Sequence, residues 1–211
     1  MRKTQEKKNN INKKYRIIAS VDLHGDFKAI DKIVINSKHS DLVVIAGDLS
    51  NFEQNLRRIL SKLNKSHSPV LVIPGNHETE ESMIKESRGL GNIINIHKGY
   101  YLLDNILFLG YGTGGFSRHD INFVRTTKFF DRIIKEVKPE KIVLVTHAPP
   151  FGCSVDLLGN QHVGNKDITV FIKKQKPDLV ICGHLHENAG VHDFINETLI
   201  INPGKFLFLE L

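Results

Sequence analysis

The distribution of apolar residues along the chain indicates its fold class. Six short runs rich in valine and isoleucine do not alternate with polar residues, and they cover residues 17–21, 42–46, 70–73, 142–145, 179–182 and 199–201. Continuous apolar runs of this length are typical of strands that are covered on both faces. Further strands are predicted near residues 93–96, 101–103, 106–109 and 206–211.

Amphipathic segments lie between several of these strands. Residues 27–37, 52–63, 121–137 and 167–176 carry apolar side chains at helical spacing. Strands that alternate with helices imply β-α-β crossovers in the N-terminal half and a mainly parallel sheet. The strand-rich middle and C-terminal part suggest a second sheet. We therefore predict an α/β fold.

Composition and charge divide the chain into a short tail and one domain. The length of 211 residues suits one domain, and 40% hydrophobic with 25% charged residues is a globular balance. Residues 1–16 hold seven basic groups and one acid, which accounts for the whole net charge of +6. We therefore expect a basic flexible tail at residues 1–14 and a single domain at residues 15–211.

The same features bear on location and partners. No run approaches the roughly 20 apolar residues of a membrane span, and residues 17–21 are too short for a signal peptide, so we expect neither a span nor export. Two cysteines, Cys153 and Cys182, form no disulfide scaffold, which favours a reducing, cytoplasmic location. The basic tail could contact nucleic acid, but a solvated terminus is the simpler interpretation. The oligomeric state stays open.

Polar residues that can bind metals follow five of the buried strands. In chain order the blocks are Asp22-Leu23-His24, Gly47-Asp48, Gly75-Asn76-His77-Glu78, Thr146-His147-Ala148-Pro149 and Gly183-His184-Leu185-His186. In open α/β sheets, ligands bind at the carboxyl ends of the strands. We therefore expect these loops to form one site.

The donor set indicates the kind of metal. Imidazole and carboxylate groups without a thiolate suit Mn, Fe, Zn, Co or Ni, and they argue against a closed structural zinc site. Seven or eight donors are too many for one such ion, so two ions that share Asp48 are expected. His184 and His186 are two residues apart and should diverge toward different ions. If Asn76 binds a metal, its neighbour His77 faces the substrate, where an imidazole suits proton donation to a leaving oxygen.

Each of these residues also has a purely structural interpretation. Asp22 could cap the following helix, Gly47-Asp48 could be an ordinary turn, and His147 could be a buried packing residue. His162 could border the substrate, and residues 111–115 form a glycine-rich turn that lacks the lysine of a phosphate-binding P-loop. The convergence of five strand ends favours the metal site over the separate structural interpretations.

Taken in order, the five blocks resemble the calcineurin-like metallophosphoesterase superfamily, and the run at residues 147–152 is similar to its small prokaryotic members. The resemblance implies a two-sheet sandwich flanked by helices, in four α-β-β-α layers. It also implies roles: Asp22, His24 and His186 hold one metal; Asn76, His147 and His184 hold the second; Asp48 bridges them; His77 is the catalytic acid; and Glu78 supports His77 or a metal-binding histidine. Asn51 stands where many members have a second acid, which puts the subfamily in doubt but not metal binding.

The implied activity is that of a metal-dependent phosphohydrolase. A hydroxide shared by two divalent ions, with Mn favoured among Mn, Fe, Zn, Ni and Co, would attack a phosphate ester, a phosphodiester in preference to a monoester. The expected partner is a small phosphate-ester molecule, and a nucleic-acid substrate is supported only by the tail. The alternative is a non-catalytic metal-binding interaction module on the same fold. Loss of the catalytic histidine would mark such a module, and His77 is present.

Overall fold

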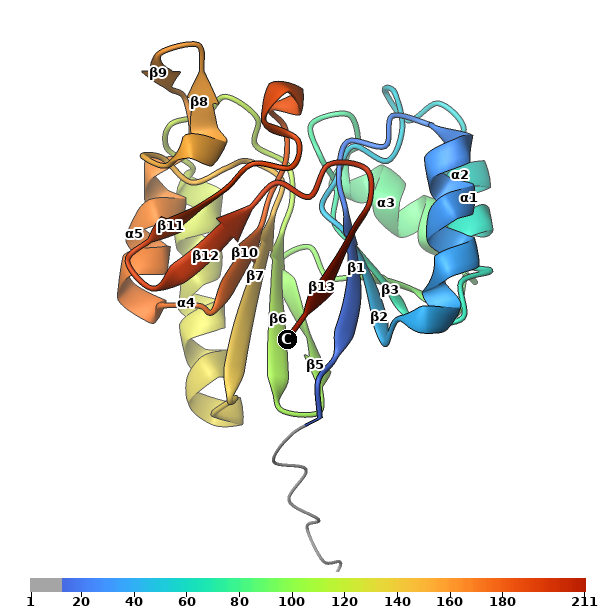
Figure 1. Cartoon of the computed structure of the whole chain (residues 1–211), viewed down its shortest axis with the longest axis horizontal. Coiled ribbons are helices and arrows are strands. Elements are labelled where there is room, and N and C mark those ends of the chain that lie inside the picture. The colour runs from blue at the N-terminus through green and yellow to red at the C-terminus, as the bar shows by residue number, and fades with distance from the viewer. Residues whose placement is uncertain (1–12) are drawn as a thin grey trace, which may run out of the picture.

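Two β-sheets pack face to face in the computed structural model, which describes residues 13–211 (Figure 1). The expected basic tail falls almost wholly on residues 1–12, outside the described part of the chain, so it stays a prediction. The first sheet has the strand order β13-β1-β2-β3-β4. Its strands are β1 (Arg16–Ser20), β2 (Leu42–Ile45), β3 (Val70–Val72), β4 (Ile93–Asn95) and β13 (Leu207–Glu210). The first four are parallel, and β13 runs antiparallel to β1.

The second sheet has the order β11-β12-β10-β7-β6-β5. Its four central strands are parallel: β6 (Ile106–Tyr111), β7 (Lys141–Thr146), β10 (Leu179–Ile181) and β12 (Thr198–Ile201). Antiparallel strands β5 (Gly99–Leu103) and β11 (His192–Ile195) form its edges. A separate short hairpin joins β8 (Leu157–Leu158) to β9 (Gln161–His162).

Helices cover the outer face of each sheet (Figure 1). The first sheet packs against α1 (Phe27–Asn36), α2 (Leu56–Leu63) and α3 (Glu80–Ser87), and the second against α4 (Ile121–Val137) and α5 (Lys166–Gln175). Three 3₁₀ turns are η1 (Ser37–His39), η2 (Ser154–Asp156) and η3 (His186–Asn188). The α/β fold with four α-β-β-α layers is confirmed. No helix of residues 13–211 is long and apolar enough to cross a membrane.

Apolar residues on both faces of the strands explain the layers. In β1, Ile17 and Ala19 enter the core between the two sheets, whereas Ile18 enters the core beneath α1 and α2. Successive side chains of a strand point to opposite faces, so a continuous apolar run buries both faces of the sheet. The strands are therefore held in place by packing on both faces. The loops at their ends are not part of this packing and can present polar side chains.

Two local predictions were incomplete. The helix predicted at residues 52–63 begins at Leu56, because residues 51–55 form a turn in which Phe52, Glu53 and Asn55 have positive φ angles. Helix α3 was not predicted, since it buries only Met83 and so lacks an apolar stripe. Its start is instead fixed by reciprocal hydrogen bonds between Thr79 and Ser82.

Candidate dimetal centre

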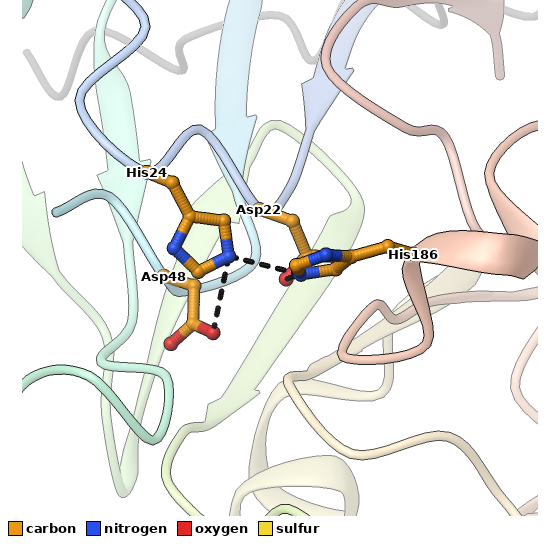
Figure 2. Close-up of side chains that lie close together, drawn as sticks. All are labelled: Asp22, His24, Asp48 and His186. Carbon is orange, nitrogen blue, oxygen red and sulfur yellow. Dashed lines mark hydrogen bonds and ion pairs between the residues drawn. The ribbon is translucent and has the colours of Figure 1, made fainter. Parts of the chain in front are cut away.

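The five predicted blocks meet at one edge of the sandwich, at the carboxyl ends of parallel strands from both sheets. Asp22 and His24 follow β1, Asp48 follows β2, and Asn76 and His77 follow β3. From the second sheet, His147 follows β7, and the pair His184 and His186 follows β10. Figure 2 shows four of these side chains, Asp22, His24, Asp48 and His186, gathered from three loops.

Tight turns direct these side chains inward. Asp22, His24, Asp48 and His184 have φ angles of 52°, 45°, 51° and 72°, so four of the thirteen non-glycine residues with positive φ in residues 13–211 belong to the predicted ligand set. Aspartate and histidine are enriched in this left-handed region, but the conformation is still unfavourable. Such strain concentrates at functional sites because the surrounding fold holds it in place.

The first group of side chains consists of Asp22, His24 and His186, with Asp48 beside it. The Nε2 atoms of His24 and His186 lie 2.9 Å apart. His186 Nε2 is 3.8 Å from Asp22 Oδ1, and His24 Nε2 is 3.7 Å from Asp48 Oδ2. One ligand atom from each of these four residues lies within 4.8 Å of all the others. The Nε2 atoms and the carboxylates thus converge on a single point.

The second group consists of Asn76, His147 and His184. Asn76 Oδ1 lies 3.0 Å from His147 Nε2 and 2.8 Å from His184 Nδ1. His147 is fully buried, and its Nδ1 donates to the backbone carbonyl of Ala46 at 3.0 Å. That bond leaves the lone pair of a neutral His147 on Nε2, directed toward the other members of the group.

Asp48 lies between the two groups. Its Oδ2 is 3.7 Å from His24 Nε2 and 3.4 Å from His147 Nε2. Its Oδ1 accepts a hydrogen bond from the backbone N–H of His77 at 3.0 Å. Gly75 permits this placement, because a Cβ there would lie 1.9 Å from Asp48 Oδ1. A single buried carboxylate therefore connects the donors of both groups.

Burial, hydrogen bonds and neighbouring charges shift the pKa values of the site in both directions. Burial alone would lower the pKa of His147, but the hydrogen bond and negative charge of Asp48 outweigh it and raise that pKa, so a cation that binds at His147 Nε2 would displace a proton. Burial alone would raise the pKa of Asp48, but the hydrogen bond and positive charge of His147 outweigh it and lower that pKa to about 2. Burial and the charge of His147 lower the pKa of His184 to about 4, so its imidazole is neutral near pH 7. Burial instead raises the pKa of Asp22. An ionised carboxylate beside a neutral imidazole suits a divalent cation.

His77 lies beside the two groups. Its Nδ1 accepts the backbone N–H of Phe52 at 3.3 Å, and its Nε2 lies 3.9 Å from Asp48 Oδ2. Because Nδ1 accepts, the neutral ring carries its proton on Nε2. Its side chain is 18% exposed. His77 can therefore present a proton to a molecule bound over the site.

Glu78 differs from the expectation that it supports a histidine. Its carboxylate is buried and accepts from the backbone N–H and the hydroxyl of Ser50, at 2.8 and 2.7 Å, and from the backbone N–H of Gly75 at 3.0 Å. It therefore joins the loop that carries Asp48 to the loop that carries Asn76. Burial raises its pKa, and its hydrogen bonds partly offset that effect.

Two asparagines hold the loop that carries His184 and His186. Asn202 is fully buried and donates through Nδ2 to the carbonyl of Leu185 at 3.0 Å. Asn188 donates through Nδ2 to the carbonyls of Val155 and Leu157 at 2.9 and 2.8 Å. The backbone at Gly204 also accepts from Val21, so the turn at residues 202–204 ties this loop to β1.

Several alternative interpretations can now be compared with the geometry. Asp26, not Asp22, caps α1, with its Oδ1 accepting from Lys28 and Ala29. His162 pairs with the buried Asp156 at 2.6 Å, apart from both groups. The glycine-rich turn does border the site, because a Cβ at Gly115 would lie 3.4 Å from Cε1 of His184.

Sequence reasoning did not predict the contacts that several further residues make in the site. Serine is common in loops, so nothing in the sequence marked Ser50 as a partner of Glu78. Phe52 was predicted to lie in a helix, which begins only at Leu56. Asn51 donates through Nδ2 to the carbonyl of His24 at 3.1 Å, so this residue, noted in the sequence only as a departure from the family pattern, supports the first loop. Phe116 contacts His184, and only its place after the glycine-rich turn could have indicated it.

The residues fit a pair of divalent ions. The Nε2 atoms of His24 and His186 lie 2.9 Å apart, close enough for both to bind the same cation. The two groups offer nitrogen and oxygen donors only, which matches borderline transition metals. Asp48 adjoins both groups, as a carboxylate shared by two ions must.

Comparison with known proteins identifies the family to which the chain is similar. The family model described as calcineurin-like phosphoesterase matches residues 15–188. The uncharacterised protein MJ1162 of Methanocaldococcus jannaschii is 30% identical over 198 residues, covering 90% of this chain and 88% of that protein. The 3′,5′-cyclic adenosine monophosphate phosphodiesterase CpdA of Escherichia coli is 22% identical over 202 residues, covering 90% and 70%.

Solved structures share the fold. The crystal structure of TT1561 of Thermus thermophilus superposes with a TM-score of 0.74 at 18% identity, covering 91% of this chain and 90% of that one. At this identity the likeness bears on architecture alone. It agrees with the arrangement of two sheets flanked by helices described above.

Proposed function

Because the chain belongs to the calcineurin-like phosphoesterase family, we propose that it is a two-metal phosphohydrolase that cleaves phosphodiesters in preference to monoesters. The observation that carries this proposal is the arrangement of seven donors from five strand ends into two groups joined by Asp48. His77 lies beside both groups, where a proton donor would be needed.

The residues would divide the work as follows. Asp22, His24 and His186 would hold one ion; Asn76, His147 and His184 would hold the other; and Asp48 would bind both. When bound, the two ions would neutralise the phosphoryl oxygens and activate a water as the nucleophile. Mn is the favoured metal, with Fe, Zn, Ni and Co as alternatives, since the nitrogen and oxygen donors suit all of them.

His77 would act on the leaving group. The proton on Nε2 would pass to the oxygen that leaves phosphorus from the doubly protonated ring, so that a neutral imidazole, and not an imidazolate, is left behind. Solvent would return a proton to the ring before the next turnover, since the His77 side chain is 18% exposed. The seven donors include no serine or cysteine that could act as a nucleophile. We therefore expect water to attack phosphorus directly, without a covalent enzyme intermediate.

The preference for diesters rests on a relative. CpdA, 22% identical, is named as a phosphodiesterase. A small phosphate-ester molecule is therefore the proposed partner, and the cytoplasm, inferred from two isolated cysteines, stays the predicted location.

The test compares metal-free protein with protein loaded with each candidate metal. We expect the manganese form to hydrolyse bis(4-nitrophenyl) phosphate faster than 4-nitrophenyl phosphate, and EDTA to abolish both reactions. The matched control is His192→Ala, because His192 is an exposed histidine on the edge strand β11 and should leave both rates unchanged.

Two outcomes would contradict the proposal. Full activity in protein freed of metal would exclude the two-metal site. Protein that binds two ions but cleaves no ester in a panel of cyclic and linear diesters, monoesters and nucleotides would instead favour the interaction module.

A further inference from the structure

Two exposed phenylalanines lie against histidines of the site. Of the twelve phenylalanines, Phe52, Phe116 and Phe194 are exposed, with relative exposures of 74%, 60% and 58%. The ring of Phe52 stacks on His77 with centroids 4.2 Å apart, and the ring of Phe116 meets His184 edge-on at 4.4 Å. Single exposed apolar residues are normal on a protein surface, but two that contact the same polar site call for an explanation.

The turn that presents Phe52 is strained and firmly held. Phe52, Glu53 and Asn55 have φ angles of 47°, 65° and 59°, which phenylalanine and glutamate rarely adopt. The Glu53 carboxylate accepts from the backbone N–H and the hydroxyl of Thr79 at 3.0 and 2.8 Å, and its own N–H donates to Ser50 Oγ at 3.1 Å. The fold thus maintains an unfavourable conformation that keeps a large apolar ring in water.

The segment that presents Phe116 is built similarly. It follows Thr113, Gly114 and Gly115, with φ angles of 66°, 102° and 89°. Beyond the ring, the carbonyl of Ser117 accepts from Asn165 Nδ2 at 2.8 Å. Both phenylalanines therefore lie on turns that are held by hydrogen bonds and that bring one ring to His77 and the other to His184.

Their neighbours define what the rings could contact. Phe52 lies on the ring that would donate a proton to the leaving group, and Phe116 lies on a histidine of the second group. A group bound next to the scissile phosphorus would meet these ring faces and edges. Aromatic rings prefer planar partners in offset or edge-to-face contact, and such contacts add affinity beyond the buried area.

We propose that Phe52 and Phe116 form an aromatic subsite, which selects phosphate esters that carry a planar ring near the scissile phosphorus. This inference rests on the proposed function, since it places the ring on the substrate of that site. The ring could be an aryl group attached directly to the ester or a nucleobase one sugar away, and two pairs of probes separate these sources.

The experiment measures binding as well as turnover. Calorimetry on manganese-loaded protein compares phenylphosphonate with methylphosphonate, and adenosine 5′-monophosphate with ribose 5-phosphate. We expect the ring-bearing member of at least one pair to bind roughly tenfold more tightly. Phe52→Ala and Phe116→Ala should each reduce that preference severalfold, and Phe52→Tyr, which keeps a ring, should retain it.

Phe194→Ala is the matched control, because Phe194 has similar exposure but lies on edge strand β11. It should leave the preference in place. Equal binding within both pairs, or a preference that survives both alanine substitutions, would overturn the subsite.

The proposed function can fail separately. If ring-bearing ligands bind selectively but no ester is cleaved, the subsite stands and the hydrolase does not. If esters are cleaved without any preference for a ring, the hydrolase stands and the subsite does not.

Discussion

The two halves of the proposed metal site differ in how the fold builds them. Asp22 and His24 come from one loop, and the third member of the first group, His186, is 59% exposed at the start of a 3₁₀ turn. Asn76, His147 and His184 come from three different strands, and His147 is fully buried. The second group therefore contains a histidine held in the packed interior, whereas the first contains one on an exposed turn, although Asn76 of the second group is also exposed.

The halves also differ in charge. The first group contains a carboxylate, Asp22, whereas the second contains the neutral amide of Asn76. Both groups lie next to Asp48. The first group therefore carries more charge, and the second contains the fully buried histidine. We expect the sharing of Asp48 to make the two halves function together.

The largest effect is expected from removing the shared charge. Asp48→Asn keeps the size of the side chain but removes the anion next to both groups, so metal binding should weaken in both halves and hydrolysis should fall to background. Metal analysis after dialysis and a diester assay check this. A variant that keeps one tightly bound ion would show that the halves are independent.

The next largest effect concerns a residue outside both halves. His77→Ala should keep two ions but lower kcat about 10²- to 10⁴-fold, because general acid catalysis typically contributes that much. The loss should be smaller for diesters with strongly acidic leaving groups, which need less protonation. If the variant instead loses metal in proportion to activity, His77 is a ligand rather than the acid.

A third prediction compares the stability lost when a buried and an exposed histidine of the site are removed. In metal-free protein, His147→Ala should lower the free energy of unfolding by about 1–3 kcal/mol, because it leaves buried polar groups without a partner. His186→Ala lies in an exposed position and should change it by no more than about 0.5 kcal/mol. Urea denaturation measures both, and equal losses would contradict the difference between the halves.

The smallest effect is expected from the support between loops. Glu78→Gln keeps one acceptor but directs an amide N–H₂ toward the donors of Ser50 or Gly75, so the Asp48 loop should shift. Activity should fall about tenfold, as for other groups that orient ligands, with both ions still bound. Activity equal to that of the parent protein would show that Glu78 acts in folding alone.

Much of this architecture was predictable, and the reason is the pattern of β1 and its neighbours. Continuous apolar runs such as residues 42–46 indicate strands buried on both faces, and the residue types after them indicate a metal site. The end of a strand is a local property, so residues such as Asp22 and His147 could be identified without knowledge of their partners.

The rest depends on contacts between distant segments. Phe52 occupies an apolar position in a helical pattern, but Glu53 bonds to Thr79 and holds the turn outside the helix. Asn202 and Asn188 support the His184–His186 loop through carbonyls that only the folded chain brings near. Hydrophobic periodicity carries no information on such contacts, so the supporting hydrogen bonds and the contacts of Phe52 and Phe116 with histidines are seen only in the structure.

The central claim is that two cations bind on either side of Asp48. Anomalous diffraction from crystals soaked in Mn²⁺ measures this directly. We predict two peaks about 3.5–4 Å apart, one against Asp22, His24 and His186 and the other against Asn76, His147 and His184. A single peak at full occupancy under saturating metal, or peaks away from Asp48, would contradict the claim.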